Sequence, residues 1–211
     1  MTPPLFDVDG LPAPLPGTSS PQAALFVDRW GTLLELPTKN NSAAFKDIQF
    51  TEGALDALFR ATQAGWTLYL VGNEDLVSTG KVSDKAWIKF EAELLSTMQA
   101  KGVRVAHSYA CLDHPEKGKG AHQRDSVFLL PNTGPMYHAR QHDGIHLPTS
   151  WVIGDSTLEL ASGWRAGCRT ASVKSGLAAA DGEVEIDVEF QGENLAAVLD
   201  EIMQLAAAAN N

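Results

Sequence analysis

Cysteine, long apolar runs and positive charge are all scarce in this chain of 211 residues. The two cysteines, Cys111 and Cys168, are too few for a disulfide framework, which favours a reducing compartment. No apolar run approaches the ~18–20 residues that a helix needs to span a bilayer. The first residues have neither the basic segment nor the apolar segment of a signal peptide. We therefore expect a cytoplasmic protein that does not cross a membrane.

Lysine and arginine total 16 residues against 26 aspartates and glutamates, so the formal net charge is −10. Nucleic acids and anionic membranes are bound chiefly through clustered basic residues, so neither is expected as a partner. Such an acidic chain suits a bound cation, and a protein partner remains open. The hydrophobic share of 44% and the charged share of 20% are those of a globular domain with a substantial core.

Proline concentrates at the N-terminal end, where six of the eleven prolines fall within residues 1–22. This stretch buries too little area to offset the entropy of ordering, so it indicates a tail before one folded domain over residues 23–211. In that domain, short apolar segments alternate with segments of helical periodicity. The alternation predicts an α/β fold, namely a doubly wound, mainly parallel sheet with helices on both faces and no large cap.

The same periodicities set the expected element boundaries. Strands are predicted at Ala23–Asp28, Trp66–Val71, Val103–Tyr109, Trp151–Asp155 and Arg169–Val173. Helices are predicted at Glu52–Ala64, Asp84–Lys101, Met136–His142, Thr157–Ala166 and Glu193–Ala209.

Two of the predicted strands end in a carboxylate, Asp28 and Asp155. Ligands of open α/β sheets bind at the carboxyl ends of the strands, so these side chains are expected to lie together. Two carboxylates and a backbone carbonyl suit a hard cation such as Mg²⁺. The alternative is that each aspartate only caps the turn or helix that follows it.

The segment Asp28-Arg29-Trp30-Gly31-Thr32 carries a family resemblance. It is similar to the first motif of the haloacid dehalogenase superfamily, Asp-x-Asp-Gly-Thr, in the Asp-Arg-Asp-Gly-Thr form of histidinol-phosphate and heptose-bisphosphate phosphatases. The resemblance implies that Asp28 is the nucleophile, that it also binds Mg²⁺, and that the Trp30 carbonyl is a further magnesium ligand. It implies as well that the substrate is a small phosphorylated metabolite.

The segment from Gly154-Asp155 to Glu159 resembles the fourth motif of the same superfamily, Gly-Asp-x-x-x-Asp. By this resemblance, Asp155 and Glu159 complete the magnesium site. Glu159 differs from the motif only in being one methylene longer than aspartate.

Three other positions depart from the pattern of the phosphatases. Trp30 stands where an aspartate normally protonates the leaving group, and its indole cannot do so. Gly72, in Val71-Gly72-Asn73-Glu74, replaces the phosphate-binding Thr or Ser, and Leu130 replaces the conserved lysine. Loss of general acid catalysis alone typically costs roughly 10²–10⁴-fold in rate.

Further site residues follow from the resemblance. We expect substrate contacts from Arg29, Asn73 and Asn132, and Lys117 and Lys119 are candidates to replace the missing lysine. The relatives also hold a structural zinc through Cys-x-His and Cys-x-Cys. Here only Cys111 of that ligand set remains, in Cys111-Leu112-Asp113-His114, so a closed tetrahedral site is not expected.

Three functions remain open at this point. The first is a divergent magnesium-dependent phosphohydrolase whose activity is weak or lost. The second is a non-catalytic binding or scaffold protein that retains the fold. The third, and the least favoured, is a dehalogenase-type hydrolase, because dehalogenases of the superfamily carry an aromatic residue at the position of Trp30.

Overall fold

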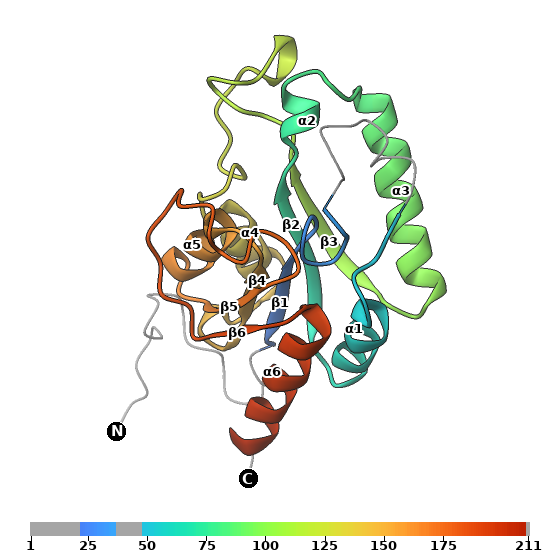
Figure 1. Ribbon diagram of the computed structural model, residues 1–211, viewed down its shortest axis with the longest axis vertical. Coiled ribbons are helices and arrows are strands. Elements are labelled where there is room, and N and C mark those ends of the chain that lie inside the picture. Colours follow the sequence, from blue (N-terminus) through green and yellow to red (C-terminus); the bar gives the residue numbers. More distant parts are fainter. Residues whose placement is uncertain (1–21, 37–47, 210–211) are drawn as a thin grey trace.

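The strands form one parallel sheet in a computed structural model that describes residues 22–36 and 48–209 (Figure 1). Its strands are β1 (Ala24–Asp28), β2 (Thr67–Asn73), β3 (Val105–Cys111), β4 (Trp151–Gly154), β5 (Arg169–Val173) and β6 (Phe190–Gly192). Their order is β3-β2-β1-β4-β5-β6, and every neighbouring pair is parallel. The predicted doubly wound sheet is thus confirmed. The predicted tail lies outside the described residues except for Gln22.

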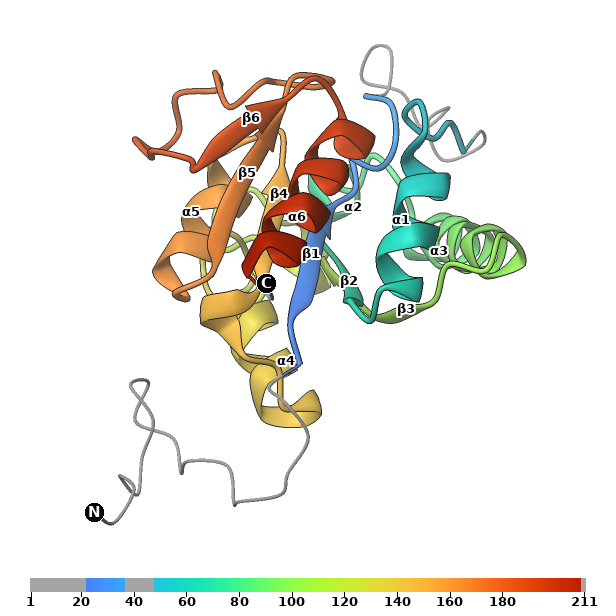
Figure 2. The same ribbon diagram turned by 90° about the horizontal axis from the view of Figure 1, so that it is seen from below.

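Helices cover both faces of this sheet (Figure 2). One face carries α1 (Ala54–Gln63), α3 (Asp84–Ala100) and α6 (Leu195–Ala209), and the other carries α4 (Gly134–Asp143) and α5 (Thr157–Arg165). A four-residue helix, α2 (Asp75–Ser78), follows β2, and two 3₁₀ turns occur at Gly120–His122 and Leu147–Thr149. No helix in the described ranges combines the length and the apolar character needed to cross a membrane.

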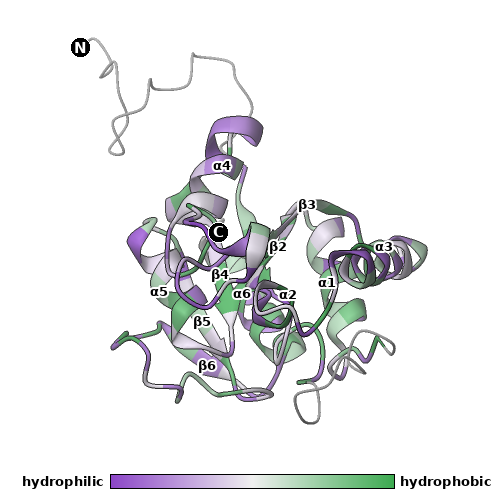
Figure 3. Cartoon of the chain, turned by 90° about the horizontal axis from the view of Figure 1, so that it is seen from above, coloured by the Kyte–Doolittle hydropathy of each residue, from purple (hydrophilic) through white to green (hydrophobic). Residues whose placement is uncertain are grey.

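The central strand shows why the sheet is two-sided. Every residue of β1 is buried, with Leu25 and Val27 in the core beneath α1, α3 and α6, and Phe26 in the core beneath α4. Successive side chains of a strand point to opposite faces, so a continuous apolar run is what a strand covered on both sides requires. Figure 3 shows the resulting pattern, with hydrophobic residues on the strands and hydrophilic residues on the outer turns of α3 and α4.

The helix predictions need small corrections. Two apolar residues inside the predicted helices, Ile88 and Phe59, are 64% and 42% exposed, because the buried stripes of α3 and α1 are narrower than the apolar sequence pattern. Two elements, α2 and β6, were not predicted. Each has only three or four residues and is too short to show a period, and β6 exists through its pairing with β5.

Candidate active site

Three carboxylates meet where β1 and β4 end and α5 begins. Asp28 closes β1, Asp155 follows β4, and Glu159 lies in the first turn of α5. One oxygen of each lies within 4.8 Å of the others, and the residues are only 7%, 3% and 4% exposed, respectively. The sequence prediction that Asp28, Asp155 and Glu159 lie together is therefore matched in space.

The environment of this cluster disfavours negative charge. Burial raises the pKa of Asp28 well above its ordinary value, and the charges of Glu159 and Asp155 raise it further. Burial and then the Asp155 charge raise the pKa of Glu159 to about 7, and burial raises the pKa of Asp155. A hard divalent cation with oxygen ligands would relieve this repulsion, so the donor set fits Mg²⁺.

The loop after β5 covers Asp155. The backbone N–H of Leu177 donates to Asp155 Oδ2 over 2.7 Å, and the N–H of Ala179 donates to the Asp155 carbonyl over 2.6 Å. A Cβ on Gly176 would stand 1.9 Å from Asp155 Oδ2, so only glycine permits this approach. The sequence analysis did not identify this loop, although Ser175-Gly176 directly after a predicted strand was an available signal.

Glu159 has a structural task besides its place in the cluster. Its Oε1 accepts from the Ser156 N–H over 2.6 Å and its Oε2 accepts from Ser156 Oγ over 2.8 Å. Ser156 Oγ accepts in turn from the N–H of Leu158, so the pair forms a capping box at the start of α5. The cap fixes the carboxylate at the strand edge.

Arg29 lies beneath the cluster and is fully buried. Its Nη1 donates to Glu74 Oε1 over 3.2 Å, its Nη2 donates to Ser108 Oγ, and Glu91 lies 3.7 Å from Nη2. The substrate contact expected for Arg29 therefore needs correction, because a guanidinium without exposed surface has nothing to offer a ligand. Its charge still lowers the pKa of Asp28.

Trp30 and Glu74 form a direct pair. The indole N–H of Trp30 donates to Glu74 Oε2 over 3.1 Å, and the ring stacks on Phe90 of α3 with centroids 5.4 Å apart. Glu74 is 3% exposed, and burial raises its pKa to about 7 against the opposing effects of Arg29 and the indole. No role was predicted for Glu74 from the sequence. Its place just beyond the predicted strand Trp66–Val71 was an available signal, because ligands of such sheets bind at the carboxyl ends of the strands.

Gly72 stands between these groups at the end of β2. A Cβ built on it would lie 3.0 Å from Asp28 Oδ1 and 3.2 Å from Arg29 Nη1. Its φ of +153° also falls in the range that side chains rarely adopt. A serine or threonine at this position would therefore be strained in the present backbone.

Asn73 and Leu130 are joined to each other. The amide of Asn73 donates to the Leu130 carbonyl over 3.0 Å and accepts from the Leu130 N–H over 2.9 Å. Leu130 is 4% exposed, so an apolar side chain is buried at the position aligned with the family's lysine. Both ends of the Asn73 amide thus hold a loop, and this replaces the expected substrate contact.

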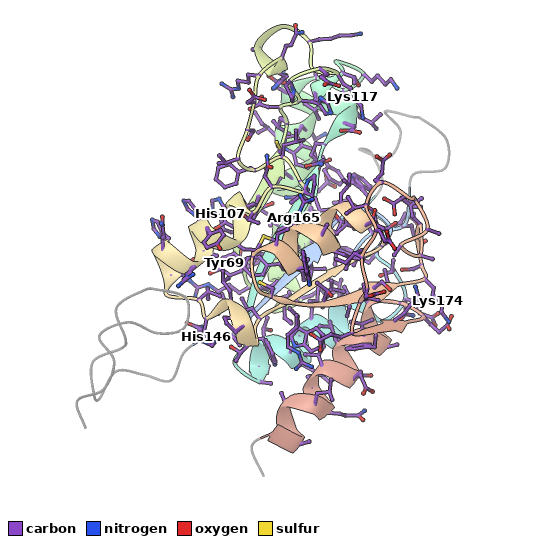
Figure 4. The ribbon with its side chains drawn as sticks, turned by 90° about the vertical axis from the view of Figure 1, so that its left-hand side faces the viewer. Tyr69, His107, Lys117, His146, Arg165 and Lys174 are labelled. Carbon is purple, nitrogen blue, oxygen red and sulfur yellow. The ribbon has the colours of Figure 1, made fainter. Side chains whose placement is uncertain are left out.

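The other residues expected at the substrate lie on loops. Asn132 is exposed and donates to the Ser126 carbonyl. Lys117 and Lys119 are exposed on the loop beside α2, and the Lys119 N–H donates to the Ser78 carbonyl (Figure 4, where Lys117 is labelled). Among the described residues, no hydrogen bond or ion pair joins any of the three to the carboxylate cluster.

The loop that resembles a zinc-binding loop is held by other bonds. His122 bridges two aspartates, with Nε2 2.8 Å from Asp84 and Nδ1 3.1 Å from Asp113. Arg124 donates to the same Asp113, and Cys111 is buried with a pKa raised by that burial. Asp113, at the position aligned with a zinc ligand, thus belongs to a hydrogen-bonded network.

Comparison with known proteins finds sequence relatives that include a heptose-bisphosphate phosphatase and the bifunctional protein HisB. No protein-family model matches the chain. A D-glycero-beta-D-manno-heptose-1,7-bisphosphate 7-phosphatase of Haemophilus influenzae is 28% identical over 184 residues, which cover 86% of this chain and 94% of the relative. The histidine biosynthesis bifunctional protein HisB of Legionella pneumophila is 27% identical over 131 residues, which are 62% of this chain and 35% of that longer protein.

A solved structure agrees in fold. The D,D-heptose 1,7-bisphosphate phosphatase of B. bronchiseptica, complexed with magnesium and phosphate, superposes with a TM-score of 0.73 at 22% identity, over 86% of this chain and 99% of that one. The sequence relatives, the order of the strands and the carboxylates at the strand ends all point to the same family. The chain is a member of the haloacid dehalogenase superfamily, in the branch of the heptose-bisphosphate and histidinol-phosphate phosphatases.

Proposed function

We propose that this protein is a magnesium-dependent phosphohydrolase that acts on a small phosphorylated metabolite, with Asp28 as the nucleophile. The observation that carries the proposal is the cluster of three buried carboxylates at the ends of β1 and β4. Its relatives are named as phosphatases of a heptose bisphosphate, so a sugar phosphate is the substrate class to test first.

Each residue then has a chemical task. A carboxylate oxygen of Asp28 attacks phosphorus, the P–O bond to the leaving alcohol breaks, and water later releases phosphate from the aspartyl phosphate. The side chains of Asp28, Asp155 and Glu159 and the carbonyl of Trp30 would hold Mg²⁺. When bound, this ion would neutralise charge on the phosphoryl oxygens.

Arg29 supports the nucleophile from below. It is the cation whose charge lowers the pKa of Asp28, and it keeps this position through Glu74 and Ser108. We infer that Arg29 supplies part of the positive charge that the missing lysine would have given. Because it is fully buried, it acts on Asp28 and does not touch the substrate.

The position of the family's general acid is occupied by Trp30. Trp30 donates its indole N–H to Glu74, and an indole does not titrate in the range of a general acid. Such help is typically worth roughly 10²–10⁴-fold, about 3–5 kcal/mol of barrier. We therefore expect slow turnover of alkyl phosphates. The loss of rate should be smaller for aryl phosphates, because their leaving groups depart without a proton.

The test is phosphate release with Mg²⁺ from an aryl phosphate and from sugar phosphates, for wild type, Asp28→Asn and Asp125→Asn. The control residue Asp125 is exposed and does not belong to the carboxylate cluster. Loss of turnover in Asp28→Asn alone supports the proposal, as does Mg²⁺-dependent capture of beryllium fluoride. Turnover that survives in Asp28→Asn refutes the role of Asp28.

A second function is favoured by one observation. Trp30, at the position of the family's general acid, donates a hydrogen bond to Glu74. Glu74 also forms a buried ion pair with Arg29, so the three side chains make one network. Such a network fits a non-catalytic protein that binds Mg²⁺ and a phosphorylated ligand. Calorimetric binding of Mg²⁺ with phosphate, together with no turnover of any ester, would select this function.

A further inference from the structure

Three histidines lie side by side on the surface, where β3 faces α4. His107 comes from β3, and His138 and His142 stand one turn apart on α4. The ring centroids of His107 and His138 are 6.0 Å apart, and those of His138 and His142 are 5.4 Å apart. All three residues are exposed. Figure 4 shows His107 and Tyr69 beside α4, with His146 further along the same side of the molecule.

We propose that His107, His138 and His142 form a second metal site, for Zn²⁺, separate from the carboxylate cluster. Imidazole nitrogens suit zinc and similar borderline metals, whereas carboxylates suit magnesium. Two histidines at positions i and i+4 of a helix present their rings on one face, as in helical zinc sites. Three protein ligands leave a fourth tetrahedral position for water.

Oxygen atoms lie beside two of the three rings, as they commonly do beside histidines that bind zinc. Tyr109 Oη lies 3.0 Å from His138 Nδ1, which leaves Nε2 of that ring for a metal. On the next turn, His142 Nδ1 lies 3.6 Å from Asp143 Oδ1, and Tyr69 Oη donates to Asp143 Oδ2 over 2.6 Å. Zinc-bound histidines usually donate their second N–H to a carboxylate or another oxygen, which fixes tautomer and orientation.

Electrostatics also favour a cation here. His142 lies in the last turn of α4, where the unpaired carbonyls of a helix attract positive charge. Partial burial and the neighbouring His138 lower the pKa of His107. Asp143 and Glu91, which oppose that shift, add negative charge on the same side.

The rings now stand roughly parallel, with 12° between His138 and His142 and 29° between His107 and His138. They do not yet point at one centre, so binding requires rotation about the side-chain torsions. His107 and His142 are exposed and have that freedom, whereas His138 keeps its contact with Tyr109 Oη. Zinc binding should therefore order the three side chains without moving the sheet.

The experiment uses full-length protein without a histidine tag, stripped with EDTA and then saturated with Mg²⁺ so that the carboxylates are occupied. Zn²⁺ is titrated by calorimetry into wild type, His138→Ala, His142→Ala and the control His146→Ala. His146 belongs to the same segment, but its Nδ1 lies 3.1 Å from Thr149 Oγ1. We expect one zinc per wild-type and His146→Ala chain, and binding weakened at least about tenfold in the other two variants.

A second measurement tests the geometry. Tyr109→Phe keeps the ring but removes the oxygen beside His138 Nδ1, and it should weaken zinc binding by roughly 10–100-fold. Co²⁺ in place of Zn²⁺ should give the visible absorption of a tetrahedral ion in wild type, and this should disappear in His142→Ala. Equal zinc affinity in all variants, or zinc binding that is lost only in Asp155→Asn, would overturn the proposal. Neither result bears on whether Asp28 hydrolyses phosphate esters.

Discussion

Asp28→Asn should make the metal-free protein more stable at alkaline pH while it removes the proposed nucleophile. The substitution keeps the shape of the side chain and deletes one of three clustered negative charges. A carboxyl whose pKa is raised by folding stabilises the fold below its unfolded pKa, and this contribution is lost as pH rises through the folded pKa. For Glu159 the window runs from 4.5 to about 7.

The distances within the cluster set the magnitude. Carboxylate oxygens within 4.8 Å of each other repel by about 3 kcal/mol per pair at an effective dielectric constant of about 20. The shift of the Glu159 pKa from 4.5 to about 7, caused first by burial and then by the Asp155 charge, corresponds to about 3 kcal/mol in total, so it is an upper bound on what repulsion contributes at that carboxyl. The attraction between Arg29 and Asp28 is lost in the variant and offsets part of the gain. We expect a net stabilisation of about 2 kcal/mol at about pH 8, near zero at about pH 5.

The assay is thermal unfolding followed by circular dichroism in EDTA, for wild type, Asp28→Asn and Asp125→Asn. For a domain of this size, about 2 kcal/mol raises the melting temperature by roughly 4–8 °C. Excess Mg²⁺ should close the gap by stabilising wild type more than Asp28→Asn. The reasoning is refuted if Asp28→Asn melts at or below the wild-type temperature at both pH values, or if Asp125→Asn gains equally.

Three further outcomes are expected. Trp30→Phe removes the donor to Glu74 and should cost about 1.5–3 kcal/mol in urea unfolding above about pH 8, and less below about pH 5, where Glu74 is protonated. Gly176→Ala places a Cβ 1.9 Å from an oxygen of Asp155, so it should cost about 1–3 kcal/mol and reduce the melting shift caused by Mg²⁺. His122→Gln should increase hydrogen exchange in residues 111–125 most at acidic pH. The pKa of His122 is raised by its two aspartate partners, so the stabilisation from the charged ring is present below about 6.5 and lost as pH rises through the raised value.

The central strands and the carboxylate cluster were predictable from the sequence. Four apolar residues before Asp28 can be buried on both sides only in the middle of a sheet, and the same holds for the strand before Asp155. Since parallel strands present their carboxyl ends at one edge, the two aspartates had to approach each other. Glu159 followed from the resemblance of Gly154–Glu159 to the Gly-Asp-x-x-x-Asp motif.

The surroundings of the cluster were not predictable in this way. Arg29 reaches Glu74 across 45 positions and Ser108 across 79, and no local pattern encodes which buried cation meets which acid. The loop over Asp155 lacks a period, and its fit depends on a missing side chain at Gly176. The conformation of a loop or a buried polar network is fixed by tertiary contacts. It cannot be predicted from the residue type at one position.

Three residues of the site depend on one another, namely Trp30, Gly72 and Glu74. The indole donates to the Glu74 carboxylate, and an aspartate restored at position 30 would set two carboxylates against each other where a hydrogen bond now stands. A threonine restored at position 72 would meet Asp28 Oδ1 at 3.0 Å, at a φ of +153° that its branched side chain disfavours. Either single substitution would therefore require its neighbours to shift. In the present arrangement Asp28 keeps its place in the carboxylate cluster, and the residues around it are bonded to one another.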